Sequence, residues 1–451
     1  MALRGSRDKF VRGLGRKIFY GWVVLGVAAL AMFVSGPGQS HTFSVFVGPI
    51  GRDLDLSETT IASAYGLATL AAAFLLPYMG KFLDRSGARR MLSLVALGLG
   101  LACIAFSGVA SVIWLTLGFG VLRFLGQGSL MLGSANMVSQ WFRRKRGFAL
   151  SLMALGFSLS MAVHPPVSQW LIDLVGWRQA WLWIGLSTWV LLMPPLLFFV
   201  VNRPEDVGLL PDGETVAALK TSGSEEVLQG MDSRGAETAP DASDTEAGLT
   251  LKQALQTSAF YIIAIGLFSL SMLVTSLHFF QVSIFQSHGL SAQTAVRVFP
   301  VSALVMVLTI PLIGRMLDHF RTAWMFAAAL VIMAVSLISA TQVENFVTAL
   351  VYAVVFGLNN AATITMFAFM WPRYFGRRYL GSIQGTGQMV GVLGASLGPI
   401  ALGISQDIFG GYTPMLLALT AIPACCAILA LFLRDPDLRK FQPVQSAKPT
   451  I

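Results

Sequence analysis

Apolar residues run through this chain in twelve long blocks, separated by short polar stretches. A helix needs roughly 20 predominantly apolar residues to cross the hydrocarbon core of a bilayer, and each block reaches about that length. The pattern predicts an all-α membrane protein with twelve transmembrane helices. The predicted spans lie near residues 19–48, 57–80, 90–110, 113–140, 147–173, 179–201, 258–286, 293–316, 322–341, 346–371, 380–407 and 412–433.

The composition agrees with that pattern. Hydrophobic residues make up 55% of the chain and charged residues 12%, whereas a soluble domain normally carries about a quarter charged residues. The first block is far longer than the apolar region of a cleaved signal peptide. The three cysteines, Cys103, Cys425 and Cys426, fall inside predicted spans and show no metal-binding spacing. We expect no metal site, no cofactor and no enzymatic activity.

The net charge of +9 is unevenly distributed. If the N-terminus is cytoplasmic, all but four of the 31 Lys and Arg residues fall on the cytoplasmic side. The exceptions are Arg123, within a span, and Arg52, Arg178 and Arg297, on the outer side. This is the positive-inside distribution, and it predicts that both termini are cytoplasmic. The basic clusters therefore indicate orientation and lipid contact, not nucleic-acid binding.

The chain divides into two similar halves. Between residues 203 and 248 there are eleven Asp and Glu but only three Lys and Arg, which is typical of a flexible linker. GKFLDRSG from Gly80 is echoed by GRMLDHFR from Gly314, and WFRRKRGFAL from Trp141 by WPRYFGRRYLGSI from Trp371. Because each half has an even number of spans, the halves are predicted to be parallel repeats. The predicted parts are a basic tail (1–18), an N-terminal half (19–202), an acidic cytoplasmic linker (203–256), a C-terminal half (257–434) and a C-terminal tail (435–451).

Two motifs resemble signatures of the major facilitator superfamily. GKFLDRSGARR (80–90) resembles that superfamily's signature between its second and third helices, and RFLGQG (123–128) resembles its second motif. YGWVV (20–24), GWRQAW (176–181) and NRPEDVGLLPDG (202–213) are similar to the bacterial monocarboxylate and oxalate/formate porters. The resemblance implies a secondary transporter of twelve helices in a bacterial inner membrane.

Polar residues interrupt the middle of several predicted spans. The first span contains GPGQSH (36–41), and irregular backbone at that depth is tolerated only where it faces protein or a watery cavity. The resemblance implies that the first, fourth, seventh and tenth helices line the central cavity, and the unusual polar residues fall on these four. The candidate substrate-binding residues are Gln39, His41, Arg123, Gln127, His278, Gln281 and Asn359. His41 and His278 are the candidates for proton coupling, because an unperturbed histidine titrates near pH 6.5.

Each of these residues has a purely structural alternative. A cation at mid-depth costs at least about 2.5–3.5 kcal/mol, so Arg123 either contacts substrate or bonds to carbonyl groups at the break in the first span. The amides can be ordinary interhelical hydrogen bonds, which is the favoured interpretation for Asn360. His164, beside two prolines, is expected to be a packing or gating residue. Asp173 and Asp407, at outer helix ends, are expected to be structural.

The signature loop predicts a cytoplasmic gate. Asp84 can face the N-terminus of the eleventh helix near 379–381, where a carboxylate gains about 0.3–1 kcal/mol. Arg85, Arg89 and Arg90 could pair across the same seam, although Arg89 and Arg90 are equally well explained as orientation charges. The expected gate consists of Gly80, Asp84, Arg85, Gly87, Gly314 and Asp318.

One cation, two histidines and no carboxylate in the predicted cavity favour a small organic anion, such as a monocarboxylate. We therefore expect a monomeric transporter that binds a small molecule, with protons as a possible second substrate, and moves it by alternating access. Two alternatives stay open. One is an efflux carrier for neutral or amphiphilic compounds, and the other is a membrane sensor that binds a ligand without moving it.

Overall fold

The computed structural model describes residues 19–207, 209–213, 249–376 and 380–436. The predicted tails and the middle of the linker lie outside these ranges. Within them the chain is helical, and ten helices are long and apolar enough to cross a membrane. The longest, α9, has 54 residues but is interrupted at Gly176, where φ is +80°. Counting α9 as two spans and adding the broken first span gives the twelve predicted crossings.

The first half of the bundle is built from residues 21–199. Its first span is broken into four short pieces, and its fourth span changes from α-helix to π-helix and back. The elements are α2 (Gly21–Val34), η1 (Gly36–Gly38), α3 (Ser40–Phe43), α4 (Val47–Leu54), α5 (Glu58–Ser86), α6 (Ala88–Ser107), α7 (Val112–Leu122), η2 (Arg123–Leu130), α8 (Met131–Trp141) and α9 (Arg146–Phe199).

The second half is built from residues 258–431 and is more regular. Its seventh span, which corresponds to the broken first span, is one continuous helix. The elements are α13 (Ser258–Ser287), α14 (Ala292–His319), α15 (Thr322–Ala340), α16 (Phe346–Phe375), α17 (Leu380–Phe409), α18 (Thr413–Leu419) and α19 (Ala421–Leu431). The glycines that precede the last span of each half, Gly176 and Gly410, both have positive φ and lie 234 positions apart. This supports the internal repeat.

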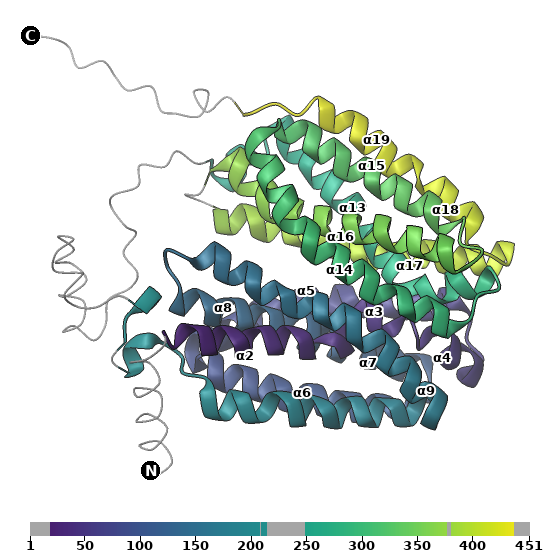
Figure 1. The fold of residues 1–451 in the computed structure, drawn as a ribbon, viewed down its shortest axis with the longest axis horizontal. Coiled ribbons are helices and arrows are strands. Elements are labelled where there is room, and N and C mark those ends of the chain that lie inside the picture. Colours follow the sequence, from purple (N-terminus) through teal and green to yellow (C-terminus); the bar gives the residue numbers. More distant parts are fainter. Residues whose placement is uncertain (1–18, 208, 214–248, 377–379, 437–451) are drawn as a thin grey trace, which may run out of the picture.

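The two halves lie against each other along their length (Figure 1). The seams between them are formed by α5 with α17 and by α9 with α14. A Cβ added to Gly66 on α5 would lie 2.4 Å from the carbonyl oxygen of Ser396 on α17. The helices approach so closely that only glycine fits, as is common where helices pack in membranes.

The end of the bundle that carries residues 19 and 436 is called here the terminal end, and the opposite end is called the far end (Figure 1). Four hydrogen bonds join the halves toward the far end. The amide N–H of Val282 donates to Ser44 Oγ (3.0 Å), and that of Thr59 donates to Asp407 Oδ2 (3.1 Å). Gln293 Nε2 donates to Asp173 Oδ2 (3.0 Å), and the Tyr412 hydroxyl donates to Glu58. The structure is therefore closed toward the far end.

Short elements of the predicted linker are described at both of its ends. They are η3 (Pro204–Val207), η4 (Pro211–Gly213) and α12 (Leu251–Ala254). Asp212 Oδ2 accepts hydrogen bonds from the backbone N–H groups of Arg143 (2.9 Å) and Arg144 (2.7 Å). The first part of the linker is thus attached to the basic loop that follows the fourth span.

Candidate functional site

The predicted break in the first span is present. Helix α2 ends at Val34, Pro37 lies in the 3-10 turn η1, and Gln39 has extended backbone angles before α3 begins. Proline lacks an N–H donor and glycine is flexible, so the GPG sequence cannot continue the helix cheaply. All residues from Val34 to Val47 are buried. The irregular backbone therefore faces protein, as the bilayer requires.

The fourth span is locally π-helical where it meets this break. A Cβ on Gly38 would lie 2.4 Å from the carbonyl oxygen of Leu122, and a Cβ on Gly126 would lie 2.9 Å from the Gly38 Cα. The two backbones touch because neither glycine has a side chain. The π-helix η2 begins at Arg123, and such segments are often found at functional sites.

Arg123 lies in the contact between these two irregular segments and is 4% exposed. Its Nη1 donates to the carbonyl oxygen of Gly38 (3.2 Å), and its guanidinium lies 4.9 Å from the centre of the Tyr65 ring. Its Nε has no hydrogen-bond partner. The predicted backbone contact is therefore present, yet it leaves a buried cation with unused donor capacity.

His41, on α3, begins a chain of polar groups. His41 Nε2 is 3.3 Å from Ser160 Oγ, which is 3.2 Å from His164 Nδ1. A hydroxyl can donate to one neighbour and accept from another, so Ser160 can link the two rings. His41 also lies close enough to Arg123 to interact with it electrostatically. The chain runs from the first span into α9.

The second half adds His278 and Asn359. The rings of His278 and His41 are 6.0 Å apart, so the two predicted histidines do meet at the interface of the halves. His278 packs on Phe356 at 4.8 Å, and Asn359 lies one helical turn further along α16. His278 Nε2 and both amide atoms of Asn359 are buried without hydrogen-bond partners. We call Arg123, His41, His278 and Asn359 the central cluster.

The other predicted amides, apart from Asn359, fall outside that cluster or at its margin. Gln39 donates to Ser35 Oγ (3.1 Å), and Gln127 is half-buried on η2. Gln281 donates to the carbonyl oxygen of Ala295 (3.3 Å) and accepts from Tyr352 (3.5 Å), so both ends of its amide are used within its own half. Asn360 donates to the Phe356 carbonyl (2.7 Å), as the structural interpretation expected.

Two residues that contribute to the site were not among the predicted ones. Ser160 and Tyr65 are ordinary residues in apolar spans, and nothing in the sequence distinguishes them. His164 packs its ring on Phe33 (4.9 Å) beside the break in the first span. Arg178, near the far end of α9's first span, forms an ion pair with Asp53 (2.7 Å).

The predicted gate is described only in part. The Asp84 side chain and residues 377–379 lie outside the described part, so the predicted contact between Asp84 and the start of α17 does too. Gly87 has φ +77° and contacts Asn202, whose Oδ1 accepts from the Arg89 amide (2.9 Å). This loop is therefore fixed to the end of α9. Gly80 and Gly314 have open space around them, and Arg85 and Asp318 are exposed.

Comparison with known proteins places this architecture in a family. A family model described as Major Facilitator Superfamily matches residues 28–399 and 263–450. An uncharacterized 38 kDa protein of Thermoproteus tenax is 24% identical over 412 residues, which are 88% of this chain and 94% of that protein. The oxalate:formate antiporter of Oxalobacter formigenes is 26% identical over 43% of this chain and 45% of its own length. Monocarboxylate transporter 11 of Mus musculus is 31% identical over 38% of each chain.

A solved structure agrees at the level of fold. A bacterial homolog of the human lysosomal transporter Spinster, in an inward-facing and unoccupied conformation, matches with a TM-score of 0.63. The match covers 92% of this chain and 95% of that one at 16% identity. Together with the family model, the helical architecture shows that this chain belongs to the Major Facilitator Superfamily and is a multi-pass membrane transporter, not an enzyme.

Proposed function

We propose that the protein is a secondary transporter for a small organic anion of the monocarboxylate type. The observation that carries this proposal is the buried Arg123, which has an unused donor and no buried acidic partner. Among the residues whose side chains the structure describes, which leaves out Asp84, no Asp or Glu is buried. A buried unpaired charge is costly unless something compensates it. A carboxylate substrate would supply the missing charge.

The other unused polar atoms suit the same ligand. The Asn359 amide and His278 Nε2 have no protein partner and come from the opposite half. Leaving a buried donor or acceptor unsatisfied costs about 1–3 kcal/mol per group. A carboxylate held between Arg123 and these groups would satisfy donors from both halves, and such a ligand would couple its binding to their rocking motion.

The partial relatives support this substrate class. The oxalate:formate antiporter and monocarboxylate transporter 11 carry, by their names, small carboxylates. The match to each covers less than half of that relative, so the substrate class rests chiefly on the central cluster.

Coupling to protons is the second part of the proposal. His41, Ser160 and His164 form a continuous chain of groups that can exchange protons, and His278 faces its inner end. Protonation of His41 or His278 would add a positive charge beside the bound anion and strengthen its binding. Substrate and proton would then bind together, which is the requirement for symport.

The proposal also includes the orientation of the protein in the membrane, its two moving halves and its cytoplasmic gate. We place the terminal end, with its basic loops, in the cytoplasm of a bacterial cell whose inner membrane holds the protein as a monomer. Residues 19–202 and 257–434 are the two moving halves, and 203–256 connects them. Gly80, Asp84, Arg85, Gly87, Gly314 and Asp318 form the cytoplasmic gate in this scheme.

The proposal is tested by exchange of labelled carboxylates. Proteoliposomes loaded with unlabelled formate, lactate or oxalate are diluted into the labelled acid, and its entry is followed. The wild type should exchange at least one acid, and Arg123→Gln should abolish that exchange. Arg297→Gln, which removes an exposed arginine on α14, is the matched control. Exchange of none of the acids, or full exchange in Arg123→Gln, would refute the proposal. Transport of neutral amphiphilic compounds instead would identify an efflux carrier.

A further inference from the structure

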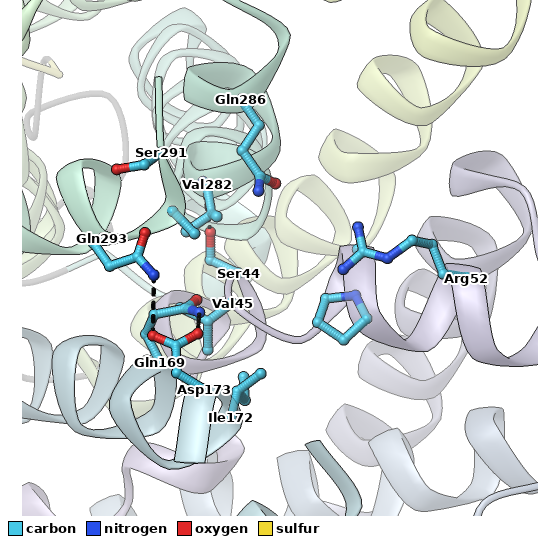
Figure 2. A pocket seen from close by; sticks show the side chains of 13 residues that line it. Ser44, Val45, Arg52, Gln169, Ile172, Asp173, Val282, Gln286, Ser291 and Gln293 are labelled. Atoms are coloured by element: carbon cyan, nitrogen blue, oxygen red, sulfur yellow. Dashed lines mark hydrogen bonds between the residues drawn. The ribbon is translucent and has the colours of Figure 1, made fainter. Parts of the chain in front are cut away.

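A hollow lies at the far end, outside the central cluster. Its volume is about 360 Å³, and it is bounded by α4, the middle of α9, the end of α13 and the start of α14 (Figure 2). Both halves therefore form its walls. Arg52, Asp173, Gln286 and Gln293 line it and are exposed, so it opens to the solvent at the far end. We call this hollow the vestibule.

The floor of the vestibule contains one of the contacts that close the far end. Ser44 and Val282 line the hollow, and the hydrogen bond between them joins the two halves. His41 lies three residues before Ser44, and His278 lies one helical turn before Val282. The vestibule and the two histidines are thus built on the same two segments, so opening this contact would bring a solute in the vestibule toward the central cluster.

Asp173, the carboxylate that lines the vestibule, already has hydrogen-bond partners. Asp173 Oδ1 accepts from Gln169 Nε2 (2.8 Å), and its Oδ2 accepts from Gln293 Nε2 (3.0 Å) (Figure 2). The neighbouring Asp53 is paired with Arg178. Both carboxylates thus have partners that do not include Arg52.

Arg52 is the charged residue of the vestibule that can bind a ligand. It forms no hydrogen bond or ion pair with another described residue, and its side chain reaches into the hollow from α4 (Figure 2). A Cβ added to Gly48 would lie 3.6 Å from Arg52 Nη1 and 3.9 Å from Gln286 Oε1. The guanidinium and the amide of opposite halves therefore converge above a glycine, which leaves room for a ligand between them. The first turn of the 28-residue helix α14 adds the positive end of its dipole.

We propose that the vestibule is a loading site that binds a small carboxylate before the far end opens. Arg52 pairs with the carboxylate in a charge-assisted, bidentate manner, and the Gln286 amide donates a further hydrogen bond. The inference rests on the proposed function for the identity of the solute. It adds a second site, built from different residues, at which the anion waits on the far side.

Uptake by intact expressing cells tests the role of Arg52. Arg52→Gln should raise the KM for the transported carboxylate about tenfold, the loss expected for one charge-assisted hydrogen bond, and leave the maximal rate unchanged. Arg297→Gln removes the same charge from the same end without lining the vestibule, and its KM should stay at the wild-type value. Equal KM values for Arg52→Gln and Arg297→Gln would overturn the proposal.

A labelling experiment separates this inference from the proposed function, because it does not require transport. Cys103, Cys425 and Cys426 are replaced by alanine, and Ala292, which lines the vestibule, is changed to cysteine. Lactate or oxalate should slow its reaction with a membrane-impermeant maleimide, chloride at equal ionic strength should not, and Arg52→Gln should remove the protection. Absence of protection, or equal protection by chloride, would overturn the vestibule even if uptake occurs. Protection without uptake of any carboxylate would support the vestibule and refute the proposed function.

Discussion

At the scale of single residues, the informative feature is the set of buried polar atoms that have no partner. Arg123 Nε, His278 Nε2 and both amide atoms of Asn359 belong to this set. Such groups are rare in native structures because each one loses its hydration without replacement. In the function we propose, a substrate supplies the missing partners for part of the transport cycle. The substrate-free protein is then less stable, because the polar atoms that bind the substrate stay unsatisfied.

That explanation predicts opposite effects for two neighbouring asparagines. Asn359→Leu removes an unsatisfied amide from a fully buried position, so the apparent Tm should rise and carboxylate exchange should be lost. Asn360→Leu removes an amide that donates to the Phe356 carbonyl, so its Tm should not rise and exchange should persist. Thermal unfolding in detergent and the exchange assay measure both. A fall in Tm for Asn359→Leu, with exchange retained, would show that the amide is structural.

The proton chain makes a second prediction at this scale. Ser160→Ala removes the hydroxyl between His41 and His164, whereas Ser160→Thr keeps a hydroxyl at the same position. Ser160→Ala should retain carboxylate exchange but lose at least about tenfold in pH-driven uptake, because the chain is interrupted. Ser160→Thr should retain both activities. Unchanged pH-driven uptake in Ser160→Ala would exclude this route for protons.

At the scale of elements, the break in the first span and the π-helix of the fourth span pack against each other. The Gly-Pro-Gly sequence predicted the break, because its residues disrupt a helix wherever they occur. The π-helix was not predictable in that way. RFLGQG permits either geometry, and the segment adopts η2 where it meets the backbone of Gly38.

The close contact predicts a strong effect of one methyl group. Gly38→Ala would place a Cβ 2.4 Å from the carbonyl oxygen of Leu122, so the two spans must separate and the Arg123 contact with Gly38 must change. Transport should fall by at least about tenfold, since displacements near 1 Å can cost far more than that. Gly26→Ala, on the same span with nothing within 4 Å, is the control and should be near neutral. Normal transport by Gly38→Ala would mean that this contact is not needed.

At the scale of the whole molecule, polar contacts among the described residues join the two halves at the closed far end. Tyr412, in the turn between α17 and α18, donates to Glu58 across the halves. Burial, and secondly the charge of Glu58, raises the pKa of the Tyr412 hydroxyl, so it stays protonated and remains a donor at physiological pH. Asp407 accepts from the Thr59 amide beside it. These contacts must break when the far end opens.

Removing one of them should therefore shift the population toward the open state. In a cysteine-free background with Thr42→Cys, a buried reporter beside His41, Tyr412→Phe should increase labelling by an impermeant maleimide from the far side. The loss of one hydrogen bond, about 0.5–1.5 kcal/mol, corresponds to roughly a two- to tenfold change. Tyr261→Phe, at an exposed position on α13, should have no effect. Equal labelling in the two variants would show that the Tyr412 contact does not hold the end closed.

The architecture was predictable from the sequence because hydrophobic blocks, charge bias and repeat spacing can be read along the chain without knowing which residues meet in space. The twelve spans and the family were therefore confirmed. His41 and His278 were both proposed as cavity residues, and their rings lie 6.0 Å apart. The partners Ser160 and Tyr65 were not proposed, because an isolated serine or tyrosine in an apolar span carries no signal. Asp173 and Asp407 were expected to be structural, and both form contacts between the halves that depend on how the halves dock.

We propose that the protein transports a small carboxylate together with a proton, with Arg123 at the binding site. The most direct test uses proteoliposomes that contain a pH-sensitive dye and receive formate, lactate or oxalate from outside, with the signal of empty liposomes subtracted. We predict protein-dependent acidification with at least one acid and none with Arg123→Gln. If no acid gives a protein-dependent signal, or if Arg123→Gln acidifies as fast as the wild type, Arg123 is not the centre of a proton-coupled carboxylate site.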